Sequence, residues 1–203
     1  MKRIGLYFGT FNPVHVGHLI IANYMAYNTD LDQVWLVVSP QNPLKEKTGL
    51  LADYHRLALV RIAIEDNPRL RASDVEFSLP KPSYTVDTLA YLSDAHPEQH
   101  FSLIMGEDNL RTLHKWKNHE VILEHHRIYV YPRVLTEQEK AELKPHRSPS
   151  AITKHSSIVR VDAPVMKVSA SFVRRSIKAG QSVRYLLTEP VHRYIEEMHF
   201  YRS

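Results

Sequence analysis

The feature that most constrains this chain is a junction near its start, where an apolar run, a loop of small residues and a helix-like stretch follow one another. The run Ile4–Phe8 predicts a buried strand, and Leu19–Met25 predicts the body of a helix. The loop between them opens with Gly9 and Thr10, which let a ligand approach the backbone closely. Because a helix N-terminus presents free N–H groups and a partial positive charge, the junction favours a bound phosphate.

Two histidines lie three residues apart where this helix is expected to begin, His15 and His18. Imidazoles beside a helix N-terminus add hydrogen-bond donors and charge to a phosphate site. Taken alone, the pair could equally be two surface histidines in a strand-to-helix turn. The whole string Phe8–His18, at the first strand-to-helix junction of the chain, favours a nucleotide site.

Composition indicates an intracellular globular protein that acts on small anions. The chain has 203 residues and no cysteine, which excludes disulfides and thiolate metal sites and predicts a cytoplasmic location. Its formal charge of +4, with 13 histidines, fits anionic substrates. The Lys and Arg residues form no dense tract, so we do not expect a nucleic acid as a partner. The apolar stretches are far shorter than the roughly 20 residues of a membrane helix, and Met1–Arg3 leads into a strand, so we expect neither a membrane span nor a signal peptide.

Strand-like and helix-like segments alternate along the chain, which is typical of a parallel sheet covered by helices. We expect strands at Arg3–Phe8, Val34–Val38, Leu70–Val75 (short and near an edge), Phe101–Met105, Arg127–Tyr131 and Ser156–Val161. We expect helices that begin at about Gly17, at a cap at Asp53 and at Thr188–Pro190. We also expect a helix that follows Thr85 and ends at about Leu92, a short helix around Val121–Leu123, and a helix at Ser171–Ala179 that Gly180 ends. The predicted fold is α/β, a Rossmann-like doubly wound parallel sheet with helices on both faces. Residues 1–203 are expected to form one domain, in which 135–157, with a polar helix around Glu137–Leu143, is either a lid or a surface excursion.

Two motifs resemble those of a known superfamily. The string Gly9–His18, GTFNPVHVGH, resembles the HxGH signature of the nucleotidylyltransferases, and Val168–Arg174 resembles their C-terminal ISxTxxR motif. From Lys2 to Tyr201 the chain is similar to the bacterial nicotinate mononucleotide adenylyltransferases. The resemblance implies transfer of the adenylyl group of ATP to nicotinate mononucleotide during NAD synthesis, with Mg²⁺ carried by ATP and no metal ligand from protein side chains. It also allows the chain to form a homo-oligomer.

The resemblance also implies a set of residues that bind ATP. They are Gly9, Thr10, Phe11, His15, His18, Gly106, Asp108, Ser169, Ser171 and Arg174. Among them His15, His18 and Arg174 are the implied catalytic groups, which hold and stabilise the phosphates. This chemistry asks mainly for positioning and electrostatics, because a phosphate monoester with a second pKa of about 6 is already an anionic nucleophile at neutral pH. Each residue has a structural alternative: a helix cap for Asp108 and the two serines, and a surface salt bridge for Arg174.

A second set would bind the acceptor. Ser83, Tyr84 and Thr85 match the family's PSYT string, which receives the nicotinate carboxylate, and Trp116 falls where the family stacks an aromatic ring on the pyridine. A core tryptophan is the alternative for Trp116. Asn42, Lys45 and Arg133 match the residues near the mononucleotide phosphate more loosely, and Lys47 competes with Lys45.

Two further hypotheses stay open at this stage. The chain could transfer a nucleotidyl group to another phosphorylated acceptor, such as nicotinamide mononucleotide, phosphopantetheine or a cytidylyl-transfer substrate. It could also be a nucleotide-sensing module without turnover, which is suggested only by Asn12 at a position where most relatives have Asp. Loss of that charge is expected to weaken any role of the side chain in holding the loop or a metal.

Overall fold

The protein's structure is a computed structural model that describes residues 1–40, 50–132 and 150–202. In this part of the chain, six parallel strands form one sheet in the order β3-β2-β1-β4-β5-β6. The strands are β1 (Lys2–Gly9), β2 (Gln33–Val38), β3 (Leu70–Ser73), β4 (Gln99–Gly106), β5 (Ile128–Tyr131) and β6 (Ile158–Arg160). This is the Rossmann order, in which the chain winds outward in one direction and then in the other. The predicted fold class is confirmed.

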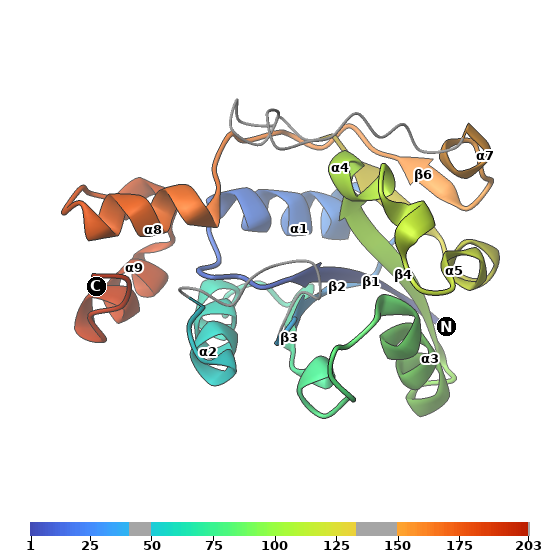
Figure 1. Cartoon of the computed structure of the whole chain (residues 1–203), viewed down its shortest axis with the longest axis horizontal. Helices are drawn as coiled ribbons and strands as arrows, with labels where there is room; N and C mark the ends of the chain where they lie inside the picture. Colours follow the sequence, from blue (N-terminus) through green and yellow to red (C-terminus); the bar gives the residue numbers. More distant parts are fainter. Residues whose placement is uncertain (41–49, 133–149, 203) are drawn as a thin grey trace.

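Helices cover both faces of the sheet, with α1 on one side and α3 on the other (Figure 1). They are α1 (Val16–Asn28), α2 (Asp53–Ala63), α3 (Thr85–Ala95), α4 (Glu107–Leu110), α5 (His119–His125), α7 (Ser150–Thr153), α8 (Ala170–Lys178) and α9 (Glu189–Glu197). Short 3-10 turns lie at η1 (Val75–Phe77), η2 (Leu113–Lys115) and η3 (Arg184–Leu186). Within the described residues, none of these helices has the length and apolar character that crossing a bilayer requires.

The side chains of the central strands alternate between two apolar cores, as the pleat of a strand requires. On β1, Ile4 and Leu6 point into the core shared with α3 and α5, whereas Tyr7 points into the core shared with α1, α2, α8 and α9. Because central parallel strands are buried on both faces, they are apolar throughout, and this explains why their sequences were recognisable as short continuous apolar runs.

The remaining differences from the expected elements have local causes. The edge strand β3 ends at Ser73 because the chain turns at once into η1. Ala52, not Asp53, is the N-cap of α2, and the Asp53 carboxylate instead accepts a hydrogen bond from Arg56. Gly180 ends α8 with a φ of +70°, a conformation that suits glycine. The polar helix predicted around Glu137–Leu143 lies outside the described residues.

A fully buried arginine on α2 joins the loops that follow the first two strands. Arg56 is 0% exposed, although it lies on a helix whose neighbouring positions are apolar. Its guanidinium donates to four backbone carbonyls, those of Thr10, Ser39, Pro40 and Leu51. Its remaining charge is balanced by Asp53, at 2.6 Å. A planar group with five donors can satisfy several carbonyls that the fold has removed from water, so Arg56 holds these loops in one arrangement.

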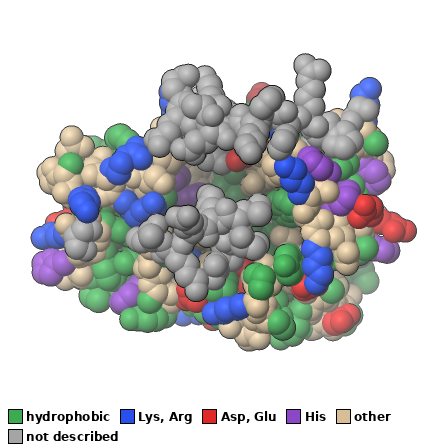
Figure 2. All heavy atoms as spheres, in the orientation of Figure 1, with side chains coloured by type: hydrophobic (Ala, Val, Ile, Leu, Met, Phe, Trp, Pro, Cys, Tyr) green, Lys and Arg blue, Asp and Glu red, His purple; other side chains and the backbone are tan. Residues whose placement is uncertain are grey.

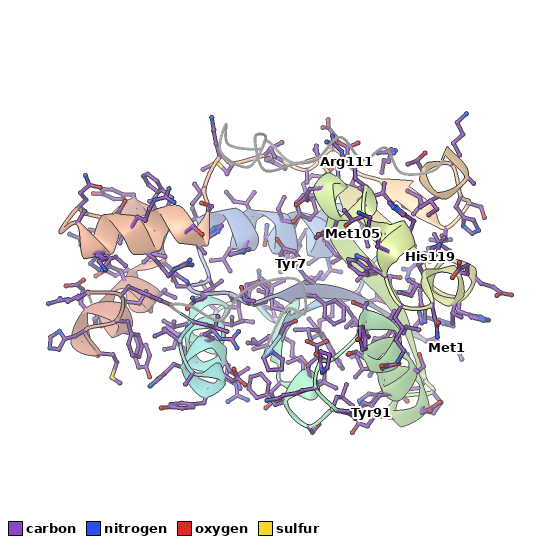
Figure 3. The ribbon with its side chains drawn as sticks, in the orientation of Figure 1. Met1, Tyr7, Tyr91, Met105, Arg111 and His119 are labelled. Atoms are coloured by element: carbon purple, nitrogen blue, oxygen red, sulfur yellow. The ribbon has the colours of Figure 1, made fainter. Side chains whose placement is uncertain are left out.

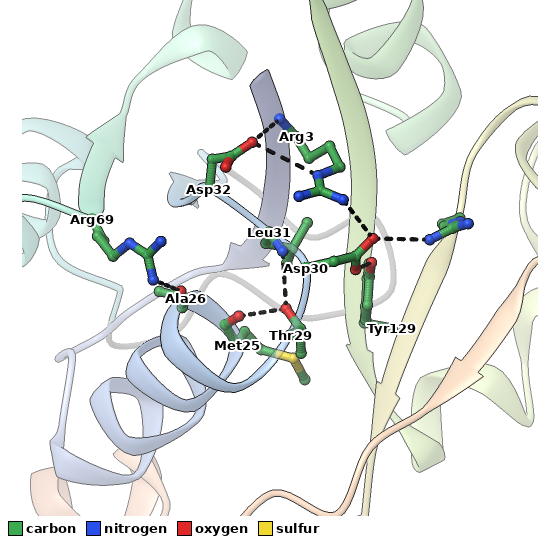
Figure 4. Close-up of polar contacts among 10 residues, drawn as sticks. Arg3, Met25, Ala26, Thr29, Asp30, Leu31, Asp32, Arg69 and Tyr129 are labelled. Carbon is green, nitrogen blue, oxygen red and sulfur yellow. Dashed lines mark hydrogen bonds and ion pairs between the residues drawn. The ribbon is translucent and has the colours of Figure 1, made fainter. Parts of the chain in front are cut away.

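A second polar cluster lies at the opposite, amino-terminal edge of the sheet (Figure 4). Asp30, in the connection between α1 and β2, accepts a hydrogen bond from the Tyr129 hydroxyl. It also pairs with Arg3 at 3.1 Å and with Arg127 at 3.0 Å. The Tyr129 hydrogen bond, followed by the two arginines, lowers the pKa of the Asp30 carboxyl below its ordinary value, although partial burial opposes this. The cluster therefore ties the connection to β1 and β5.

Replacing Arg56 tests its role in holding the loops. We expect Arg56→Met to lower the free energy of unfolding by about 3–5 kcal/mol, since buried carbonyls and the Asp53 carboxylate lose their partner. Arg56→Lys should recover only part of this loss, because an ammonium cannot reach several carbonyls at once. Urea denaturation provides the measurement. The control is Arg61→Met on the same helix, whose side chain is 61% exposed and pairs with Asp74, so that the change should stay below about 1 kcal/mol. Equal losses for Arg56→Met and Arg61→Met would contradict this role.

The Asp30 cluster predicts a pH dependence of stability. A carboxyl whose pKa is lower in the folded than in the unfolded chain stabilises the fold above the unfolded pKa, and this contribution is lost as the pH falls through the folded pKa. Asp30→Asn should therefore lower the melting temperature at about pH 7 and converge with the wild type below about pH 3. Thermal melts across this range measure the difference, with Asp94→Asn at an exposed position of α3 as the control. A difference that stayed constant down to the lowest pH would argue against an ionic contribution.

Candidate active site

The strand order reverses between β1 and β4, and the loops that leave the carboxyl ends of these strands frame the candidate active site. In open α/β sheets ligands bind at such a reversal. The loop after β1 leads to α1, and the turn after β4 leads to α4. On the other side of β1, the Ser39 N–H group at the end of β2 donates to the Gly9 carbonyl at 2.9 Å. The carboxyl ends of β1 and β2 are therefore neighbours in space.

His15 and His18 lie against each other at the start of α1. His15 is the N-cap residue and is buried, and the two rings stack with their centroids 3.7 Å apart. The His15 backbone N–H group donates to Nδ1 of His18 at 3.2 Å. Because Nδ1 accepts this bond, the ring proton of His18 sits on Nε2, which makes Nε2 a donor. The pair is thus a capping arrangement that also leaves His18 with a donor suited to a phosphate oxygen.

Aromatic packing beneath these histidines explains the small residue at the start of the loop. The Phe11 ring is buried and lies edge-on to the His18 ring, with centroids 5.0 Å apart. A Cβ atom on Gly9 would come within 2.8 Å of the Phe11 ring. Packing against Phe11 therefore favours glycine at the end of β1, and the expectation that Gly9 also admits a ligand stays a prediction. Tyr7, on β1 beneath α1 (Figure 3), packs edge-on against both Phe11 and His18.

Arg174 reaches the same loop from the other end of the chain. Its Nη1 donates to the Asn12 carbonyl at 2.7 Å, and its Nη2 donates to the Ser171 hydroxyl at 3.3 Å. The guanidinium thus joins α8 to the loop that carries His15 and His18, so the two motifs that resemble those of the nucleotidylyltransferases lie together. With the carboxylates of the described residues, Arg174 forms no salt bridge of the kind that the alternative predicted.

Asn12 holds the loop although it lacks the negative charge of aspartate. Its Oδ1 accepts hydrogen bonds from the Tyr201 hydroxyl at 2.8 Å and from the Leu51 N–H group at 3.2 Å. The side chain is 4% exposed, and burial raises the pKa of the Tyr201 phenol, which stays neutral and donates. An amide oxygen meets these two donors without the cost of burying a carboxylate. Asn12 therefore contributes two hydrogen bonds to the loop, and the expected weakening relative to aspartate stays a prediction.

The other residues assigned to ATP are distributed over two helix starts. Gly106 is the N-cap of α4, so Asp108 lies inside the first turn and is not the cap that the alternative proposed. The Asp108 Oδ1 atom lies so near Gly106 that a Cβ there would come within 2.5 Å of it. Ser169 caps α8 by accepting a hydrogen bond from the Phe172 N–H group at 3.2 Å. A capping role is thus confirmed for Ser169 and excluded for Asp108.

A pocket of about 340 Å³ brings the predicted acceptor residues together with the start of the β1–α1 loop. Its lining includes Ser83, Tyr84, Thr85 and Trp116, and also Gly9 and Thr10. The volume suits a small ligand, and the wall combines aromatic with polar groups. Figure 2 shows Lys and Arg side chains to the left and to the right of the centre of this face. Residues that the sequence assigned to two substrates therefore share one pocket.

The start of α3 forms the polar wall of this pocket. Tyr84 is the N-cap, and its carbonyl accepts the N–H groups of Asp87 and Thr88. The N–H groups of Thr85 and Val86 precede these bonds and have no partner within the helix, which suits an anion. Lys117 lies over the Tyr84 ring and pairs with Asp87 at 2.9 Å, so that a cation also lies at this helix start.

Trp116 follows η2 and is half-buried. One part of the ring packs against the core beneath α3 and α5, and another part lines the pocket. The core alternative thus describes part of the side chain, and stacking on the pyridine stays a prediction. Asn42, Lys45, Lys47 and Arg133, and residues 135–149 of the predicted lid, lie outside the described residues, so these expectations also stay predictions.

Sequence reasoning missed three residues that shape the site: Arg56, Glu76 and Tyr201. Two of them carried a signal. Arg56 interrupts the apolar positions of a predicted helix, and Glu76 follows a predicted strand, at the edge where ligands bind. Tyr201 carried none, since no local pattern links the last residues of a chain to a loop near its beginning. Among the described residues, no cluster of three or more His, Cys, Asp or Glu side chains could hold a metal.

Comparisons with known proteins identify the family of this chain. A family model described as cytidylyltransferase-like matches residues 6–176. Proteins from Flavobacterium johnsoniae and Flavobacterium psychrophilum, both named "Probable nicotinate-nucleotide adenylyltransferase", are each 54% identical over 99% of this chain and 100% of their own. The Plasmodium falciparum nicotinic acid mononucleotide adenylyltransferase complexed with NaAD shares the fold, with a TM-score of 0.78 at 18% identity over 99% of this chain and 98% of its own. The chain therefore belongs to the nicotinate-nucleotide adenylyltransferases of the cytidylyltransferase-like family.

Proposed function

We propose that this enzyme transfers the adenylyl group of ATP to nicotinate mononucleotide and that the pocket between the β1–α1 loop and the start of α3 is where the two substrates meet. One observation carries the proposal: Ser83–Thr85 and Trp116 line the same pocket as Gly9 and Thr10. The relatives named as nicotinate-nucleotide adenylyltransferases support this choice of acceptor. The products are nicotinate adenine dinucleotide and pyrophosphate, in the synthesis of NAD.

The reaction needs little proton transfer. An oxygen of the mononucleotide phosphate, already ionised near neutral pH, attacks the α-phosphorus of ATP. The bond from that phosphorus to the bridging oxygen of the pyrophosphate breaks, and pyrophosphate leaves with its electron pair. The task of the protein is to bring two polyanions together and to stabilise the charge on the transferred phosphate.

The residues at the start of α1 and in α8 are suited to the triphosphate. His18 offers its Nε2–H group to an oxygen of the α-phosphate, where charge develops in the transition state. His15 and Arg174 hold the outgoing phosphates, and Ser169 and Ser171 lie on the same α8 start. Asp108, after β4, is the proposed partner of the ATP ribose. Arg174 would keep its bond to Asn12 with one arm of the guanidinium and offer the rest of the fork to phosphate.

Mg²⁺ enters this scheme as part of the ATP substrate. Mg²⁺ binds few protein ligands when substrate phosphates can hold it, so we expect the phosphate oxygens of ATP to bind it. Bound there, it neutralises charge on the leaving pyrophosphate. Other parts of the proposal stay predictions: phosphate contacts by Asn42, Lys45 and Arg133, a single domain with a lid, a cytoplasmic location and a homo-oligomer.

A pyrophosphate-release assay with a panel of acceptors tests the activity. We expect release with ATP and nicotinate mononucleotide, and at least tenfold lower kcat/KM with nicotinamide mononucleotide, because its amide lacks the charge that the start of α3 and Lys117 favour. Phosphopantetheine, and CTP in place of ATP, should give none. A preference for another acceptor would overturn the assigned substrate, and ATP binding without release for any acceptor would indicate a sensing module.

Replacement of His18 tests the phosphate side. His18→Ala should lower kcat at least tenfold and leave the melting temperature within a few degrees, because one donor to the transition state is lost while the aromatic packing beneath it remains. Steady-state kinetics and a thermal melt give both values. The control is His125→Ala on α5, whose side chain is 62% exposed and should be neutral for kcat. Turnover near the wild-type value in His18→Ala would refute its assigned role.

Replacement of Trp116 tests the acceptor side. Trp116→Ala should raise the KM for nicotinate mononucleotide about tenfold, because base–aromatic stacking contributes roughly 1–3 kcal/mol. Trp116→Phe should lie between the alanine variant and the wild type. The KM for ATP serves as the internal control and should change less than twofold in both. Equal effects on both substrates would show that Trp116 acts only as part of the core.

A further inference from the structure

A buried carboxylate beneath the pocket has no role in the reaction described so far. Glu76 lies in η1, directly after the edge strand β3, and is 3% exposed. It nevertheless lines the pocket. Burial raises the pKa of this carboxyl, whereas hydrogen bonds from hydroxyl groups oppose the rise. Because a carboxylate in such a place costs several kcal/mol unless its oxygens are satisfied, its partners indicate what the group does there.

Hydroxyl groups from separate segments of the pocket wall oppose the rise in the pKa of Glu76. They belong to Ser39, directly after β2, Ser83, in the loop before α3, and Thr88, in the first turns of α3. The Thr88 Oγ1 atom donates to Oε1 of Glu76 at 3.0 Å. Ser39 and Ser83 line the same pocket as Glu76.

The Thr88 hydroxyl connects Glu76 to the start of α3. An ionised carboxylate can only accept, so in that form the Thr88 hydroxyl donates to it. The same hydroxyl is within reach of the Tyr84 carbonyl, at 3.3 Å, and Tyr84 is the N-cap of α3. Thr88 therefore ties Glu76 to the turn with which α3 begins. A buried polar network of this kind favours one conformation of the groups that it connects.

The site that Glu76 supports is the acceptor half of the pocket. Ser83 is a member of the string assigned to the acceptor, and Thr85 begins the helix whose first N–H groups suit an anion. The β1–α1 loop, assigned to ATP, is held mainly by Arg56 and Asn12. Loss of the Glu76 network should consequently disturb one substrate and spare the other.

We propose that Glu76 is a positioning residue for the acceptor nucleotide: it binds Thr88, shares the pocket wall with Ser39 and Ser83, and thereby fixes the start of α3 in the shape that receives the acceptor. The inference rests on the proposed function. Glu76 need not touch either substrate, and its effect reaches the acceptor through the hydroxyls and the helix start. Loss of Glu76 should therefore raise the KM for the acceptor and leave the KM for ATP nearly unchanged.

Steady-state kinetics of Glu76→Ala provide the test. We expect the KM for nicotinate mononucleotide to rise at least tenfold and the KM for ATP to stay within twofold of wild type. The matched control is Leu92→Ala, which removes a buried side chain from the same helix and does not line the pocket. It should lower the melting temperature while leaving both KM values unchanged. Equal increases for both substrates in Glu76→Ala, or no increase for the acceptor, would overturn the proposal.

Two further variants distinguish positioning from charge and from loss of folding. Glu76→Gln keeps the shape and can still pair with hydroxyls, so its acceptor KM should lie within about threefold of wild type. An increase as large as that of alanine would overturn a positioning role. If Glu76→Ala does not fold, Thr88→Val carries the test: it removes one donor and keeps the shape, and its acceptor KM should rise about threefold. An unchanged acceptor KM in Thr88→Val would overturn the proposal.

The activity of the wild-type enzyme distinguishes failure of the Glu76 role from failure of the proposed function. Turnover of nicotinate mononucleotide by the wild type, together with an unaffected Glu76→Ala, would leave the proposed function standing and remove the role of Glu76. Absence of turnover by the wild type would remove the proposed function itself.

Discussion

The site depends on one buried cation that is satisfied by the backbone. Arg56 binds the carbonyls of Thr10, Ser39, Pro40 and Leu51, and these belong to segments that follow different strands. A sheet places the ends of its strands side by side, but it leaves their loops free to differ. The guanidinium reduces this freedom, because it is itself buried and must satisfy its donors with the carbonyls of these loops.

Other long-range contacts hold the residues that are proposed to bind the two substrates. On the ATP side, Arg174 and Tyr201 bring the C-terminal part of the chain onto Asn12 and so connect the two motifs of the family. On the acceptor side, the start of α3 is supported by polar groups beneath it. Adenylyl transfer asks for fixed donors around two polyanions rather than for a strong base, and a set of loops held by buried polar contacts provides such donors.

The sequence predicted the parts of this protein that follow from local pattern. The apolar runs identified the central strands because these are buried on both faces, and the HxGH-like string located the start of α1. The contacts that shape the site were not predictable in this way. Glycine at position 9 is explained by the Phe11 ring, and the tolerance of asparagine at position 12 is explained by Tyr201, which lies 189 residues away. Such pairings depend on tertiary packing, for which one sequence carries no local signal.

The central claim is that adenylyl donor and pyridine acceptor occupy one continuous pocket. A crystal structure of the enzyme with nicotinate adenine dinucleotide tests it most directly. The account predicts the pyridine ring against Trp116 with its carboxylate at the start of α3, and the dinucleotide phosphates at the start of α1 beside His18. A dinucleotide bound with its pyridine ring away from Trp116 and α3 would contradict the account.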